Sequence, residues 1–339
     1  MSAPSSGVLS YQRVIDNLLT STWYDVRKKL QKDIFQITPL YSKMVENGRI
    51  KERAPDGTHF EIPFAYAKTD QNIEWFSRGH VFGQEEKEYM TRMQYIVKNL
   101  GDNIVRYWDD ERKNKGKARI LNYVQETIDM HKMSLEDRLA TSMWNSGGSL
   151  AIHTLPELIT TTPTTGSIGG ITRSENPYMQ NIAQDGSGAT YKFSDGSILQ
   201  RMEEVFQDCG RWKSSQTGVR SPDVIITTQA IYNAYTDLAR EMGTFEFNNN
   251  SRAVNFGMGN AMFNTAEMFW DYDCPDGRMY FLNTPSLEFN YDPDNWMEMT
   301  DWKTPADRLD RMAQVVCVGQ FCCNNFRKNA VIYGIDETA

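Results

Sequence analysis

The chain has 339 residues, of which 40% are hydrophobic and 24% are charged, so it is able to bury a core and is not expected to be disordered. Its formal net charge is −8, which argues against a general nucleic-acid binder, because such a protein needs a basic face for phosphates. No apolar run approaches the roughly 18 residues of a membrane span, and segment 1–13 lacks the features of a signal peptide. We therefore expect a folded protein that is made and kept in the cytosol.

Residues 10–33 are expected to form an amphipathic helix with apolar side chains near one face. Its end is basic, and two interpretations stay open. The cations either suit the negative end of the helix dipole or contact a partner. The candidates for such contacts in this N-terminal arm are Arg27, Lys28, Lys29 and Lys32.

Residues 57–98 are predicted to form two strands, at 58–66 and 89–97, joined by a polar and aromatic segment of about 20 residues. Its apolar side chains would be unfavourable in a solvated loop. We interpret the segment as a projecting arm that a neighbouring subunit covers, and the alternative is a lid over its own domain. The inter-subunit contact candidates are Ile73, Trp75, Phe76, Arg78, Val81 and Phe82.

The longest predicted helix covers residues 117–145, a stretch without Pro or Gly. Its apolar positions recur at mostly helical spacing, and Leu135 and Leu139 are expected to face the body of the subunit. Gly147 and Gly148 are predicted to end it. The length is more than twice that of an average helix of about a dozen residues.

The remaining elements alternate without a regular βαβ repeat, which indicates the α+β class. Residues 197–212 are predicted to be a helix opened by a capping box of Ser197 and Gln200. Segment 166–170 is interpreted as backbone turns rather than a phosphate cradle. The other predicted elements are a buried strand at 224–228, a helix at 229–242, strands paired with each other at 268–272 and 278–284, and final strands at 312–323 and 330–335.

Signatures of catalysis are missing from the sequence. It has four histidines, none in a His-Glu-x-x-His arrangement, and neither a Gly-x-Ser-x-Gly elbow nor a Cys-x-x-Cys pair. The cluster of Cys317, Cys322 and Cys323 matches no zinc spacing and is interpreted as buried small hydrophobic residues. We therefore predict no catalytic residue, cofactor or metal, although folding can still gather distant residues into an enzyme site.

Four stretches, 57–76, 115–148, 166–181 and 279–335, resemble the major capsid proteins of tailed bacteriophages. The clearest are NKGKARILNYVQETIDMHKMSLEDRLATSMWNSG, SIGGITRSENPYMQN and VGQFCCNNFRKNAVIYGID. The resemblance implies the Johnson fold of the Hong Kong phage type, with an N-terminal arm, an extended two-stranded loop, a long spine helix, and peripheral and axial domains. The region before the extended loop is too short for the fused scaffolding domain of some members.

The resemblance also implies domain boundaries. They are an N-terminal arm at 1–56, an extended loop at 57–98, a peripheral domain at 99–190 with its spine helix at 117–145, an axial domain at 191–304, and a return to the peripheral domain at 305–339.

By resemblance, the function is a structural one. The subunit would assemble as pentamers and hexamers into an icosahedral head around phage double-stranded DNA, contacting the DNA non-specifically, with a separate scaffolding protein, a portal and a decoration protein as possible partners. It would be found in the virion, and in the host cytoplasm during assembly. Two alternatives remain: an encapsulin-like nanocompartment shell, and a cytosolic α+β enzyme with a site between segments 197–242 and 286–305.

Overall fold

The computed structural model describes residues 38–66, 74–81, 88–108, 117–187, 191–194, 196–211, 222–241, 261–306 and 310–336. Helices and strands are mixed without a βαβ repeat, which confirms the predicted α+β class. The chain divides into two compact units, one of residues 1–37, 100–139 and 297–317 and one of residues 38–99, 140–296 and 318–339. None of the described helices is long and apolar enough to cross a membrane.

The helices are α2 (Pro39–Glu46), α4 (Lys117–Ser142), α5 (Leu155–Leu158), α6 (Ile198–Gly210) and α7 (Gln229–Glu241), with 3-10 turns η1 (Pro177–Met179), η2 (Thr284–Ser286) and η3 (Phe326–Lys328). The strands are β1 (Ile50–Glu52), β2 (His59–Ala65), β3 (Met90–Ile96), β4 (Lys98–Arg106), β5 (Ser167–Ile168), β6 (Ile171–Thr172), β7 (Ile182–Asp185), β8 (Val224–Thr227), β9 (Ala261–Phe263), β10 (Ala266–Trp270), β11 (Arg278–Leu282), β12 (Leu287–Met299), β13 (Arg311–Cys323) and β14 (Ala330–Tyr333).

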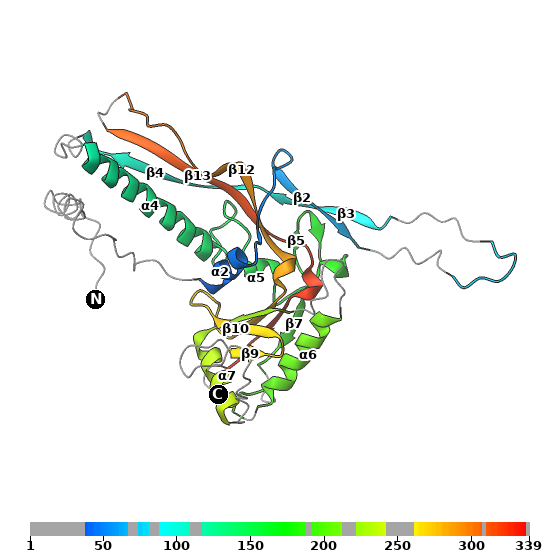
Figure 1. Ribbon diagram of the computed structural model, residues 1–339. Helices are drawn as coiled ribbons and strands as arrows, with labels where there is room; N and C mark the ends of the chain where they lie inside the picture. The colour runs from blue at the N-terminus through cyan, green and yellow to red at the C-terminus, as the bar shows by residue number, and fades with distance from the viewer. Residues whose placement is uncertain are drawn as a thin grey trace. The chain divides into compact units, whose positions relative to one another are not determined.

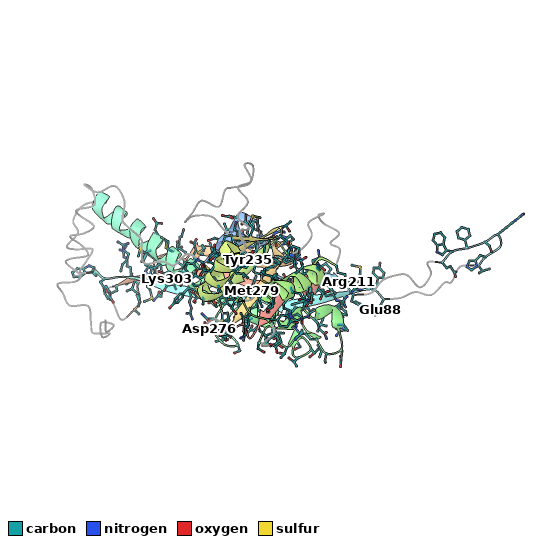
Figure 2. The ribbon with its side chains drawn as sticks, turned by 90° about the horizontal axis from the view of Figure 1, so that it is seen from below. Glu88, Arg211, Tyr235, Asp276, Met279 and Lys303 are labelled. Carbon is teal, nitrogen blue, oxygen red and sulfur yellow. The ribbon has the colours of Figure 1, made fainter. Side chains whose placement is uncertain are left out.

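The core of the second unit is a six-stranded sheet in the order β7-β14-β11-β8-β10-β9. Three of its strands, β7, β9 and β10, are labelled in Figure 1 together with α6 and α7. All four residues of β8 are buried, as predicted for a strand with neighbours on both sides. Helices α6 and α7 cover one face, where apolar side chains of both helices meet alternate residues of the strands. Tyr235 of α7 and Met279 of β11 belong to this core and are labelled in Figure 2.

The pairing predicted between the strands at 268–272 and 278–284 is wrong. β10 and β11 both pair with β8, which lies between them, β10 in parallel and β11 antiparallel. The turn at 273–277 therefore crosses β8 instead of closing a hairpin. The reason is burial: the uninterrupted apolar run of β8 loses most contact with water when it has a strand on each side.

The opposite face of the same sheet packs against Trp144 and α2. The Trp144 ring meets the Tyr280 ring edge-on with centroids 5.5 Å apart. Lys43 of α2 forms an ion pair with Glu267 at 2.9 Å, and its ammonium lies 5.0 Å from the centre of the Phe269 ring. Successive side chains of β10 thus point to opposite faces of the sheet, as in any strand.

A second sheet has the order β1-β12-β13-β4, and β1 pairs with β12 in parallel. Strand β12 was not predicted from the sequence. Its run contains aromatic residues, which favour strands, but also Asp292, Pro293 and Asp294. Aspartate and proline are depleted in strands. Leu287 to Asn290 are nevertheless buried, so the tertiary environment overrides the local preference.

The long helix is confirmed as α4, but it ends at Ser142, before the predicted Asn145 and well before Gly147. Leu135 and Leu139 are each only 4% exposed, as expected for residues that face the body of the subunit. The capping box predicted for α6 is wrong. Ser197 does not cap the helix with its side chain, and its hydroxyl instead accepts a hydrogen bond from the backbone N–H of Lys192.

All five cysteines are free and buried, which agrees with the interpretation of Cys317, Cys322 and Cys323 as small hydrophobic residues. Burial raises the pKa of the Cys323 thiol to about 12 and raises that of Cys322 further. Within the described ranges, no three His, Cys, Asp or Glu side chains are grouped so as to hold a metal ion. A raised thiol pKa lowers the fraction of the nucleophilic thiolate.

Candidate inter-subunit surface

Strands β2 and β3 form the antiparallel ladder that was predicted for the extended loop, and the register pairs His59 with Ile96 and Ala65 with Met90. Alternation puts Phe60 and Ile62 on the same side as Met93 and Tyr95, and all four are buried. Pro63 lacks an N–H and stands in a strand whose only partner among the described strands is β3, which is the edge position predicted for it.

Two contacts hold this ladder against other parts of the second unit. Phe64 and Tyr66 both stack on Tyr178, with ring centroids 5.2 Å and 5.4 Å apart. On β3, the backbone N–H of Gln94 donates to the carbonyl of Gly169 at 3.0 Å. Gly169 has φ +60°, and a Cβ there would lie 3.0 Å from the Cβ of Met93, so the close approach of the two backbones requires glycine.

Segment 166–170, which was predicted to consist of backbone turns, contains β5 and the turn that follows it. Gly169 and Gly170 both have positive φ and join β5 to β6 in a tight hairpin. The sequence did not show that this hairpin holds the extended loop. Tyr178 was missed as well, and its only signal was an aromatic residue within a polar loop.

The exposed side of the ladder carries a small polar network. Glu61 accepts hydrogen bonds from Gln94 at 3.0 Å and from Arg92 at 2.9 Å. These donors, Gln94 first, lower the pKa of the Glu61 carboxyl. The network joins neighbouring strands across the pleat, so one face of the ladder is polar while the other is buried.

Beyond the ladder lies the described part of the predicted arm, residues 74–81, which we call the tip segment. Trp75 is fully exposed, Val81 is 83% exposed and Phe76 is 69% exposed. Arg78 is exposed too. A backbone bond from His80 to Ser77 and a contact between the side chains of His80 and Glu74 at 2.6 Å shape the turn, in which Gly79 has φ +88°.

The structure thus places four of the six predicted contact residues together in one exposed stretch. Ile73 and Phe82 lie outside the described residues, and so do the N-terminal candidates Arg27, Lys28, Lys29 and Lys32. Glu88, where the described chain resumes before β3, is labelled in Figure 2. Large exposed aromatic side chains are typical of surfaces that another protein covers.

No protein-family model matches the sequence, and no curated protein is similar to it at a significant level. Solved structures do match. A chain of the capsid asymmetric unit of cyanophage A-1(L) superposes with a TM-score of 0.60 at 16% identity, over 90% of this chain and 95% of that one. A chain from the capsid of a native GTA particle gives a TM-score of 0.56 at 10% identity, over 91% and 95%.

A third match is a chain of the holo-SrpI encapsulin complex from Synechococcus elongatus PCC 7942, with a TM-score of 0.55 at 9% identity, over 94% of this chain and 96% of that one. All three superpositions run over nearly the whole of both chains, so the likeness concerns the complete arrangement of elements rather than one motif. The chain therefore has the Johnson fold of tailed-phage capsid proteins, as its sequence resemblance implied.

Proposed function

We propose that this protein is a major capsid subunit, which assembles as pentamers and hexamers into an icosahedral head around phage double-stranded DNA. The observation that carries the proposal is the superposition on the cyanophage A-1(L) capsid chain over 90% of this chain and 95% of that one. A shell needs many copies of one subunit whose contacts close by symmetry. The virion is then its location, and the role is structural rather than catalytic.

The tip segment supports the proposal. Its aromatic and aliphatic side chains are exposed in the single subunit, although exposing them costs free energy that burial against a second copy recovers, at about 25 cal/mol per Å². In this proposal, residues 57–98 are the extended loop, α4 is the spine helix, and the α6–α7 sheet belongs to the axial domain. Ile73 and Phe82 extend the contact surface, and the basic residues 27–32 add contacts from the N-terminal arm.

A nanocompartment shell is the second candidate, because the encapsulin chain has almost the same TM-score as the GTA capsid chain. The two functions differ in what the particle holds. The acidic net charge of −8 suits a container for DNA, since a strongly basic lining would grip the DNA during packing.

The experiment is negative-stain microscopy of the purified full-length protein, together with size-exclusion chromatography. A shell subunit gives closed particles, or pentamers and hexamers. A protein that stays monomeric at all concentrations would contradict both shell functions and favour an enzyme. Nuclease-protected DNA in particles from infected or induced cells identifies a head, whereas a co-purified protein cargo without DNA identifies a nanocompartment.

A further inference from the structure

A cavity of about 500 Å³ lies in the second unit, and none of the residues that line it belongs to the tip segment. Its wall comes from three parts of the chain: the start of β4, the turns at 146–153, and the stretch from α5 to the β5–β6 hairpin. The charged groups in the wall are Lys98, Arg173 and Glu157, together with the His153 ring. The rest of the wall consists mostly of hydroxyl side chains and glycine backbone.

Arg173 is an unusual group for such a wall because it is only 1% exposed. Its Nη2 donates to the backbone oxygens of Glu157 and Leu158, but its Nε is buried without an acceptor. Desolvation lowers the pKa of the guanidinium. A buried cation without an anionic partner is costly, and proteins normally pair it.

The carboxylate in the wall is not available to Arg173. Glu157 Oε2 accepts from the backbone N–H of Thr154, as part of the capping box of α5, and contacts Nδ1 of His153 at 3.2 Å. Lys98 directs its ammonium to the backbone oxygen of Ser149. Between residues that the structure describes, neither Lys98 nor Arg173 forms an ion pair, so the wall has two cations against one engaged carboxylate.

We propose that this cavity binds a small oxyanion, a phosphate or a carboxylate, between Lys98 and the Arg173 side of the wall. The volume is ample for either group, and hydroxyls such as those of Ser146 and Ser167 supply neutral donors around it. Lys98 contacts the anion directly as a mobile point charge, while Arg173 contributes its positive field from a wall of low dielectric. The anion arrives either free in solution or as an acidic side chain of a second copy of the chain.

The test measures thermal unfolding of the full-length protein during a titration with inorganic phosphate, with sodium chloride adjusted to keep the ionic strength constant. Specific binding raises the Tm along a saturating curve. Lys98→Gln shifts this curve to about tenfold higher phosphate, because one charged hydrogen bond is lost. Lys132→Gln, an exposed lysine of α4, is the matched control and keeps the wild-type curve.

Phosphate also stabilises proteins without binding, because it is excluded from their surface. This general effect is the same in all variants, so a difference between Lys98→Gln and the control identifies specific binding. A linear rise with the same slope in wild type, Lys98→Gln and Lys132→Gln overturns the proposal. A second readout is the Arg173 Nε–H signal in protein labelled with ¹⁵N-arginine, which shifts on phosphate addition if the anion lies near it. If the Tm still rises along a saturating curve but the Arg173 Nε–H signal does not shift, phosphate binds elsewhere and the proposal is also overturned.

Unassembled and assembled protein distinguish the two sources of the anion. If the ligand is free, both forms respond to phosphate. If it is a side chain of a neighbouring copy, assembled particles lose the response that the unassembled protein shows. A response in neither form contradicts the site, and this result is independent of whether particles form at all.

Discussion

The indole Nε1 of Trp144 donates a hydrogen bond to Oδ2 of Asp271 at 2.9 Å, within the buried interior of the second unit. The other oxygen, Oδ1, accepts from the backbone N–H of Asp273 at 3.1 Å. Despite these donors, burial dominates and raises the pKa of the Asp271 carboxyl above its ordinary value. The folded state therefore binds a proton at this site more tightly than the unfolded chain does.

This shift predicts how stability depends on pH. The contribution of Asp271 is fully present below the unfolded pKa of about 4 and is lost as pH rises through the raised folded pKa. Asp271→Asn removes the titrating carboxyl, and with it this pH-dependent contribution to stability, but keeps a side-chain oxygen that can accept the hydrogen bond from Trp144. We expect the free energy of unfolding of the variant in urea, minus that of the wild type, to increase from pH 4 to pH 7. A constant difference across that range would contradict the shift, and Asp276→Asn, at a less buried site in the adjoining turn, serves as the control.

A second prediction concerns Gly319 in β13. A Cβ there would lie 2.7 Å from Cζ of Phe289 and 2.9 Å from the carbonyl oxygen of Asn290, and neither group is a flexible end that moves aside cheaply. Gly319→Ala should destabilise the subunit by about 1–3 kcal/mol through overpacking. Gly101→Ala in β4 is the matched control, because its Cβ meets only the Val315 oxygen at an ordinary 3.5 Å. Chemical denaturation of both variants measures the difference, and equal midpoints would refute the crowding.

A third prediction concerns the buried side of α4. Leu135→Asp should prevent folding, because an unpaired buried charge costs several kcal/mol against a total stability of about 5–15 kcal/mol. Ser134→Asp changes the neighbouring exposed position of the same helix and should stay within about 0.5 kcal/mol of wild type. Soluble yield and circular dichroism report the outcome. A soluble Leu135→Asp variant with the wild-type Tm would mean that this face of α4 is not buried.

A fourth prediction tests the tip segment as a contact between subunits. The double variant Trp75→Ser, Phe76→Ser should keep the Tm of the unassembled subunit, because both side chains are already exposed there, yet should assemble poorly. Leu150→Ser removes an equally exposed apolar residue outside the tip, at 84% exposure, and should assemble normally. Light scattering and electron microscopy measure assembly. If the double variant forms normal particles, these two aromatic residues are not needed for the contact between subunits.

Proteolysis gives an independent check of the same surface. Trypsin should cut rapidly after the exposed Arg78 in unassembled protein, and assembly should protect this bond. Lys68 and Lys87 flank the tip in the sequence and extend the test. Equal protection of Arg78 in a verified monomer would favour a lid over the subunit's own domain.

The parts of the fold that could be predicted are those with a strong local period. The alternation through Phe60 and Ile62 predicted β2, and the apolar face of α6 from Ile198 to Cys209 predicted its helix. Local patterns do not reveal which strands pair. The alternation of side chains along β10 and β11 is the same whether these strands pair with each other or with β8. Strand β12 was missed because its residues locally disfavour the strand that long-range pairing gives them.

The exposure of the tip segment could be anticipated for a related reason. Trp75, Phe76 and Val81 stand among polar residues, so the sequence itself signals apolar side chains without a local core. The cavity near Arg173 had no such signal. Its wall joins residues from Lys98 to Arg173 that only the fold brings together, and each of them is ordinary in its own stretch of sequence.

The position of β14 in the six-stranded sheet has a consequence for synthesis on the ribosome. β14 lies between β7 and β11, and no other strand in the described part of the chain pairs with β7. Because β7 is translated long before β14, it has to wait for the arrival of that strand before its backbone is paired. The sheet is thus completed late, and a nascent or prematurely terminated chain lacks a finished second unit. Such chains carry an open strand edge, which is a template for pairing with other chains.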